Sequence, residues 1–414
     1  MIAALLKKYK RQIGDSAWSI LGLLFMNAVA QVVVFPLYAR KFGEIGYGEL
    51  QYLMAYVNIL TVSVGCAANY ARMTASRDVR EKNGGDYTLF LLLVSLLGLP
   101  FTLLVRRFGG VTMDTPTYIC YYLLFVAMAF RYYADVAYKI SLCYRRYFFY
   151  YLVIGAGYVL GAFLVWQTGI WPLGLLLGEA LGVLYAFATE RMLWHRALSP
   201  SPLWRKTFRA VLLLFAAEGV ANLILNADRI LLKLMLGASA VTVYYLATLV
   251  GKTMSLVAVP FNGVLIGYLT RYEGRLTRRA MRAVAWGSAV LVLLGMLAAV
   301  LGGYLVLLIL YPAELAAVRG YLWWGSLAQV LYFVTGMIMV VLIRFAKKSY
   351  QVYINAVFGV CFLGLGIPAT YALGLWGFAV AMVAAAAIRY AVALYLGFRH
   401  VRQKEHDPDG LTTV

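Results

Sequence analysis

The sequence contains few charged residues for its length. Only 13% of its 414 residues are charged and 63% are hydrophobic, and the mean hydropathy is +0.79. Typical soluble domains are about 25% charged, and no water-soluble fold of this length can bury so much apolar side chain. The composition therefore excludes a soluble domain, a disordered chain, a coiled coil and a disulfide-rich secreted module. It predicts a polytopic membrane protein built from helices.

Groups that usually carry catalysis are also scarce. The three histidines are His195 and His400 in expected loops and His406 in the tail, so none is placed inside a membrane segment as a general base or metal ligand. A nucleotide-binding P-loop is absent, as is a large external loop with paired carboxylates. The four cysteines lie within or at the edges of apolar segments and form no CxxC pair: Cys66, Cys120, Cys143 and Cys361. We expect neither an enzyme, nor a cofactor, nor a metal site.

Apolar stretches near 20 residues long recur along the chain. Each can cross about 30 Å of hydrocarbon at about 1.5 Å per residue. The twelve stretches are residues 16–38, 47–70, 87–105, 117–138, 147–167, 171–190, 208–236, 240–269, 283–311, 318–343, 351–372 and 376–398. The expected fold class is an all-α membrane protein of about twelve helices.

Basic residues predict the orientation of these helices. Of the 37 Lys and Arg residues, 27 lie at the N-terminus, at the C-terminus and in the loops after every second helix. The opposite loops hold only Arg40, Lys41, Arg106, Arg107 and Arg319. Cytoplasmic loops collect Lys and Arg, so both termini are expected in the cytoplasm. The net charge of +20 is thus explained by topology and does not indicate nucleic acid as a partner.

A proline-rich connection divides the helices into two sets of six. Ser199-Pro200-Ser201-Pro202 lies in the longest cytoplasmic loop and disfavours helix. We expect an N-terminal lobe over residues 1–198, a linker over 199–206, a C-terminal lobe over 207–400 and a cytoplasmic tail over 401–414. An even number of helices per lobe would make any internal repeat parallel. A glycine at a tight turn in LYARKFGEIGYG and in LLKLMLGASAVTVYY is compatible with such a repeat, although coincidental hairpin glycines would look the same.

Five basic residues remain inside the apolar stretches and are not explained by orientation. They are Arg131, Arg229, Lys233, Lys252 and Arg389. A charge at membrane depth costs about 2.5 kcal/mol or more and normally faces a bundle interior or a wet cavity. Guanidinium and ammonium groups are suited to bind phosphate oxygens. We therefore predict a cationic cavity for an anionic ligand, to which Arg40 contributes unless it is an interfacial anchor.

Further polar residues follow single helix faces. In residues 208–236, Glu218, Asn222 and Asn226 share an arc with Arg229 and Lys233, and Asn27 and Gln31 share a face of the first helix. We expect Asn27, Gln31, Asn222 and Asn226 to line the cavity. The alternative is an internal salt-bridge stripe that holds helices together.

Carboxylates at membrane depth are candidates for ion coupling. Asp135, Glu218 and Asp228 could carry H⁺ or Na⁺, or each could simply neutralise an arginine. Arg131 and Asp135 are spaced i, i+4 and able to pair on one helix face. Glu179 is expected to pair structurally with one of the arginines.

Two segments resemble a known family. ANLILNADRILLKLMLGASAVTVYYLATLVGK is similar to helices 7 and 8 of polysaccharide transporters, and FPLYARKFGEIGYGELQYL resembles their first hairpin. These are Wzx-type flippases of the multidrug/oligosaccharidyl-lipid/polysaccharide (MOP) exporter superfamily. The resemblance implies two six-helix lobes arranged in a V, alternating access and a bacterial cytoplasmic-membrane location. It also implies an undecaprenyl-diphosphate-linked oligosaccharide as cargo, membrane lipids around it and polysaccharide polymerase machinery as a potential partner.

Two other functions stay open. Multidrug cation antiporters of the superfamily use acidic residues, often in the first helix, whereas the first helix here has none at membrane depth. A membrane-embedded glycan polymerase or ligase is disfavoured by the short outer loops. For the flippase, we expect the lobes to rock about residues 199–202, driven by an ion gradient.

Overall fold

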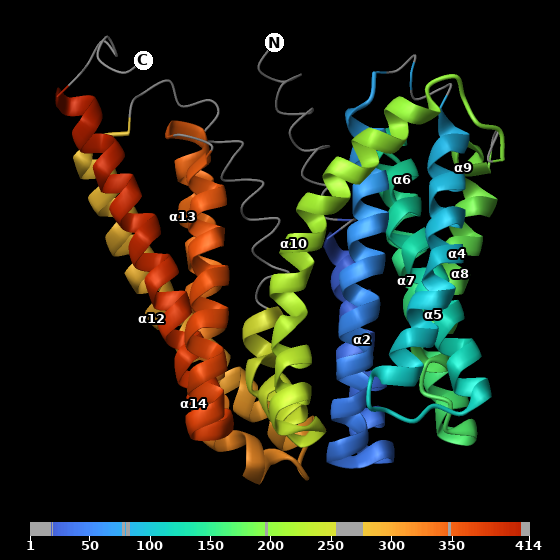
Figure 1. Cartoon of the computed structure of the whole chain (residues 1–414), viewed down its shortest axis with the longest axis horizontal. Helices are drawn as coiled ribbons and strands as arrows, with labels where there is room; N and C mark the ends of the chain where they lie inside the picture. Colours follow the sequence, from blue (N-terminus) through green and yellow to red (C-terminus); the bar gives the residue numbers. More distant parts are fainter. Residues whose placement is uncertain are drawn as a thin grey trace. The chain divides into compact units, whose positions relative to one another are not determined.

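The computed structural model describes Trp18, Val79 and residues 20–76, 83–194, 198–253, 276–346 and 349–406. These residues form helices and connecting turns without any strand. Residues 20–29 and 238–253 are helical. The other elements in chain order are η1 (Ala30–Val34), α2 (Phe35–Thr74), α4 (Gly84–Phe108), α5 (Thr115–Ala134), α6 (Val136–Ser141), α7 (Tyr144–Thr168), α8 (Leu173–Thr189), α9 (Arg191–Trp194), α10 (Trp204–Leu236), α12 (Arg278–Leu310), α13 (Leu315–Phe345) and α14 (Ser349–His406) (Figure 1).

Eight helical segments of the described chain are long and apolar enough to cross a membrane. Two of them, Ile20–Thr74 and Ser349–Gln403, have 55 residues each, and a straight helix of that length would measure about 80 Å. Each is interrupted by a glycine with positive φ, Gly43 at 67° and Gly374 at 62°, a conformation that glycine adopts without a steric cost. Each therefore accounts for two predicted stretches.

The remaining predicted stretches also coincide with helices. Leu173–Thr189 is a shorter apolar helix, and residues 238–253 begin the stretch predicted over 240–269, the rest of which lies outside the described residues. Within the described residues, each of the twelve stretches is helical except at Asp135 and at a few terminal residues. The predicted fold class, an all-α polytopic membrane protein, is confirmed.

The first helix contains a π turn. The Phe35 amide donates to the carbonyl of Ala30, five residues earlier, across η1. Pro36 follows and has no N–H, so the carbonyl of Val32 cannot be bonded in the α-helical pattern. Such a turn locally widens a helix and often occurs at functional positions. Gln31 lies within it.

Helices α7 and α8 pack at close range (Figure 1). A Cβ built on Gly157 would lie 2.5 Å from the Gly178 Cα, and one on Gly161 would lie 2.4 Å from the Leu173 carbonyl oxygen. Glycines spaced by four residues let two membrane helices approach without side chains between them. This contact places the α8 residue Glu179 in the core of the N-terminal helices.

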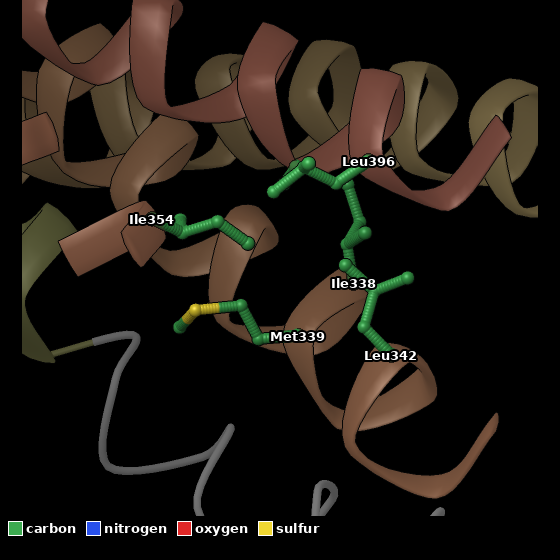
Figure 2. Close-up of a cluster of buried hydrophobic side chains, with 6 residues drawn as sticks. Ile338, Met339, Leu342, Ile354 and Leu396 are labelled. Atoms are coloured by element: carbon green, nitrogen blue, oxygen red, sulfur yellow. The ribbon is translucent and has the colours of Figure 1, made fainter. Parts of the chain in front are cut away.

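The C-terminal helices have a core of their own. Ile338, Met339 and Leu342 of α13 pack with Ile354 and Leu396 of α14 (Figure 2). Because α14 is interrupted at Gly374, the chain segments on both sides of that glycine contribute to this cluster. The core therefore joins α13 to both halves of α14.

The chain divides into two compact units, Met1–Leu231 and Leu232–Val414. Their boundary lies within α10, which itself begins at Trp204, inside the expected 199–206 linker. Helix α14 continues to His406, past the expected start of the tail at residue 401, while residues 407–414 lie outside the described part. The lobes expected over residues 1–198 and 207–400 stay a prediction.

Candidate functional site

Arg131 is buried in the first unit and neutralised by a carboxylate. Its Nε donates to the Glu179 Oε2 at 2.8 Å, and both side chains are almost fully buried. The Tyr158 hydroxyl donates to the Glu179 Oε1 at 2.5 Å, and the guanidinium lies 3.8 Å from the centroid of the Tyr132 ring. The expected pairing of Glu179 with an arginine is confirmed. This pairing reduces the charge that Arg131 offers to an anion.

Asp135 belongs to a separate buried network. Its carboxylate accepts from the Tyr147 hydroxyl at 2.8 Å and from the Asn69 side-chain amide, and Lys139 Nζ lies 3.2 Å from its Oδ2. The Arg131–Asp135 pair that the spacing allows is not formed. Helix α5 ends at Ala134, so the helical spacing behind that prediction does not extend to Asp135, and Glu179 reaches Arg131 from α8 instead.

Arg389 is the corresponding buried cation of the second unit. It is 2% exposed, and its Nη1 and Nη2 donate to the Tyr332 carbonyl at 2.7 Å and the Asn355 Oδ1 at 2.9 Å. The guanidinium lies 3.9 Å from the Tyr332 ring centroid and 5.5 Å from that of Phe358. Among the described residues, its partners are all neutral. The Arg389 site therefore keeps a net positive charge.

The polar residues of α10 lie partly against α2. Asn222 is buried and donates to the Ser63 hydroxyl of α2 at 3.1 Å, while Asn226 donates to the Asn222 carbonyl at 2.8 Å. Asn222 thus joins α10 to α2, whereas the hydrogen bond of Asn226 stays within α10. The half-buried Glu218 carboxylate makes neither a hydrogen bond nor an ion pair to any described residue.

Three more of the predicted cavity cations are half-buried. Arg229, Lys233 and Lys252 all have this intermediate exposure. Arg229 follows the buried Asp228, whose carboxylate accepts from the Arg229 amide at 2.9 Å, and Lys252 Nζ lies 5.9 Å from the centroid of the Tyr245 ring. Arg229 falls in the first unit, whereas Lys233, Lys252 and Arg389 fall in the second. Convergence of the predicted cations on one cavity stays a prediction.

The first-helix candidates differ in their surroundings. Asn27 is half-buried and donates to the Leu23 carbonyl of its own helix at 2.8 Å. The buried Gln31 Oε1 has no hydrogen-bond partner in the described part of the chain. Arg40 is exposed, and its neighbour Lys41 instead caps α7, donating to the Val165 carbonyl at 2.7 Å.

One buried arginine was not predicted. Arg72 is 1% exposed, lies 5.7 Å from the centroid of the Tyr133 ring and donates to the Met192 carbonyl at 2.9 Å. Arg72 follows the apolar stretch predicted over residues 47–70 and so counts among the basic residues of a loop, but α2 continues to Thr74. Asn69, the amide beside Asp135, was missed for a similar reason: its apolar neighbours gave no sign of a polar cluster.

Metal ligation finds no support in the described residues, where no group of three or more His, Cys, Asp or Glu side chains could hold an ion. The chemistry that the geometry offers is electrostatic. Arg389 is held by neutral groups and can neutralise an anion, and Glu218 can exchange a cation.

Solved structures share this fold. An inward-facing multidrug resistance MATE family transporter of the MOP superfamily has a TM-score of 0.71 and 13% identity, covering 94% of this chain and 99% of that chain. The lipid II flippase MurJ in an inward closed conformation has a TM-score of 0.63 and 13% identity, and the match covers 92% of this chain and 87% of that chain. The MATE transporter VcmN of Vibrio cholerae in the bent form has a TM-score of 0.59 and 13% identity, covering 96% and 98%.

This chain has the MATE and MurJ transporter fold. No protein-family model matches the sequence, and no curated protein matches it either. At this level of identity the likeness shows the fold alone. The Wzx-type resemblance and the cargo that it implies are taken up as proposals.

Proposed function

We propose that this protein is a flippase of the bacterial cytoplasmic membrane. Its cargo is an undecaprenyl-diphosphate-linked oligosaccharide, which moves from the inner to the outer leaflet by alternating access. The fold supports a transporter, since its neighbours include proteins named as transporters and as a lipid flippase.

The observation that carries the choice of cargo is Arg389. A buried guanidinium without a described carboxylate partner is costly inside a membrane protein. A diphosphate would offset that cost through charge-assisted hydrogen bonds. Arg131 is a weaker candidate because Glu179 already neutralises it. Arg229, Lys233 and Lys252 complete the proposed diphosphate set, with Arg40 at the outer end of the first helix.

A multidrug cation antiporter is the second candidate, favoured by Glu218. Its carboxylate has no described partner, so it could bind a cationic compound. Under the flippase proposal the same carboxylate is the coupling group for H⁺ or Na⁺. Asp135 is less suited to that role because Lys139, Asn69 and Tyr147 already bind it, and Asp228 already accepts from a backbone amide.

The lipids that copurify with the protein test the proposal. The protein is extracted from a producing cell, and bound lipids are identified by mass spectrometry. We expect a polyprenyl-diphosphate glycan with the wild type and with Arg319→Gln, and at least a tenfold loss with Arg389→Gln, as expected when a buried charge-assisted contact is removed. Arg389→Lys should recover only part of it, because a lysine cannot keep both hydrogen bonds and the stacked plane.

Cationic dye efflux separates the two candidates. For a flippase, neither Arg389→Gln nor Glu218→Gln changes the efflux of cationic dyes, because the cargo is an anion. Efflux that requires Glu218 and survives Arg389→Gln, together with a lack of bound diphosphate lipid in the wild type, would favour the antiporter and refute the flippase.

A further inference from the structure

A pocket lies where α4 turns toward α5, and its lining shares no residue with the clusters described above. Its volume is about 400 Å³, and its lining residues are Leu103, Arg106, Arg107, Gly110, Val111 and Thr112. This size is in the range of small-molecule and headgroup sites. On the predicted topology it lies on the extracytoplasmic side, where few basic residues occur.

Two arginines give the pocket a positive charge. Arg106 is held in place: its Nη2 donates to the Thr115 hydroxyl at 3.3 Å, and its guanidinium lies 4.9 Å from the Tyr118 ring centroid. Arg107 is exposed and lies 5.8 Å from the Phe108 ring centroid. Neither forms an ion pair with any residue that the structure describes. Arginines oriented in this way are suited to bind phosphate oxygens.

The backbone of the turn adds donors. Gly109 has right-handed helical angles (φ −72°, ψ −2°) and Gly110 has a positive φ of 67°. Successive residues of this kind form a concave nest of N–H groups that binds anions. The Gly109 amide donates to the Val105 carbonyl at 2.8 Å, whereas the amides of Gly110 and Val111 have no acceptor among the described backbone groups.

An exposed apolar face of α4 leads to the pocket. Its exposed side chains include Leu92, Leu96, Leu97, Leu103, Leu104 and Phe108. Leu103 belongs both to this face and to the pocket lining. In a membrane the face contacts acyl chains, and the end of a 25-residue helix reaches the depth of the lipid headgroups.

We propose that this pocket binds the phosphate of an anionic glycerophospholipid whose acyl chains lie along α4. The two arginines and the glycine nest hold the phosphate, and the leucine face holds the chains. The lipid belongs to the leaflet at the α4–α5 turn, which the topology predicts to be the outer one. None of its lining residues belongs to the proposed cargo site. A simpler role for the arginines, to offset the dipole at the end of α4, would not need a lipid.

Lipid-dependent thermal stability of the full-length protein in detergent tests the proposal. The unfolding midpoint is measured with added phosphatidylglycerol, phosphatidylcholine or inorganic phosphate. For the wild type we expect phosphatidylglycerol to raise the midpoint more than phosphatidylcholine does, with little effect of inorganic phosphate. The double variant Arg106→Gln/Arg107→Gln should lose most of the difference between the two lipids. Its apparent affinity for phosphatidylglycerol should fall by a factor of about ten or more.

Matched variants distinguish lipid binding from a structural effect. Arg319→Gln removes another exposed arginine of the predicted outer side and should keep the full phosphatidylglycerol effect. Arg107→Gln alone serves if the double variant does not fold, because Arg107 makes no hydrogen bond to a described residue. A double variant that is destabilised equally in every lipid, or that keeps the wild-type response to phosphatidylglycerol, overturns the proposal. An equal response of the wild type to inorganic phosphate would replace the lipid by a free anion and also refute it.

Discussion

Arg131 and Arg389 represent two ways to keep an arginine inside a membrane protein. Arg131 shares its charge with Glu179 across α5 and α8, and the tyrosine hydroxyl of Tyr158 binds the other carboxylate oxygen. Arg389 donates hydrogen bonds to a backbone carbonyl and to a side-chain amide oxygen. These neutral groups accept some of its N–H donors, but they do not neutralise its positive charge. The first arrangement stabilises a core, and the second suits an anionic ligand.

Substitution of Glu179 by Gln should strongly destabilise the first unit. It leaves the Arg131 guanidinium buried without a counter-charge, and breaking a buried ion pair in this way costs about 3–5 kcal/mol. Thermal unfolding of the purified protein should show a large decrease in the midpoint for Glu179→Gln.

The double variant provides the control. Arg131→Gln/Glu179→Gln should lose less stability than the sum of the two single variants, because each single change leaves the other charge behind. Additive losses would show that the two side chains are not energetically coupled, contrary to the contact at 2.8 Å.

At this scale the sequence predicted which residues are unusual but not which residues they contact. Arg131, Asp135 and Glu179 stood out because charges are rare in apolar stretches. Their partners depend on how α5, α7 and α8 pack, which spacing along one helix does not reveal. For Arg131 and Asp135 the spacing gave the wrong pair.

The α7–α8 contact shows how small residues set the distance between elements. A Cβ on Gly178 would lie 2.2 Å from Tyr158 Cδ1 and 2.6 Å from the Ile154 carbonyl oxygen. Backbone atoms cannot move aside easily, so the helices must separate. Because Tyr158 also binds Glu179, separation would disturb the Arg131 pair.

We expect Gly178→Ala to reduce stability by about 1–3 kcal/mol, the usual cost of overpacking a tight core. Gly287→Ala is the matched control, since a Cβ there meets no atom within 4 Å and alanine is favoured over glycine in a helix. Thermal unfolding of both variants is the measurement. A loss for Gly287→Ala as large as that for Gly178→Ala would contradict the close contact.

The expected linker is attached to α4. The Ser201 amide and hydroxyl donate to the two oxygens of the buried Asp86 at 2.7 and 2.6 Å. Asp86→Ala should release this segment, and limited proteolysis near residues 199–202 should become faster. The control variant Ser199→Ala should be cleaved at the wild-type rate, since Ser199 makes no hydrogen bond to a described residue. Equal cleavage of wild type and Asp86→Ala would show that the attachment does not hold the segment.

Elements were largely predictable because apolar length alone marks a membrane helix. Glycines also marked two of the turns, since Gly43 and Gly237 have positive φ, at 67° and 93°. Ends were less predictable: α2 and α10 extend beyond their apolar cores into polar sequence. This extension buried Arg72, which the sequence alone assigned to a loop.

For the whole molecule, the distribution of basic residues predicts that both termini are cytoplasmic. Fusions of a fluorescent protein and of alkaline phosphatase to each terminus report on which side of the membrane that terminus lies. We expect fluorescence without phosphatase activity at both ends. Phosphatase activity at either terminus would reverse the orientation and would place the α4–α5 pocket in the opposite leaflet.

Translocation in reconstituted vesicles tests the central claim most directly. Purified protein is placed in liposomes with a labelled polyprenyl-diphosphate oligosaccharide, and the label accessible from outside is followed over time under an imposed ion gradient. The account predicts protein-dependent movement of this lipid that is lost with Arg389→Gln and kept with Arg319→Gln. Movement that is the same in empty liposomes, or that does not depend on Arg389, would contradict it.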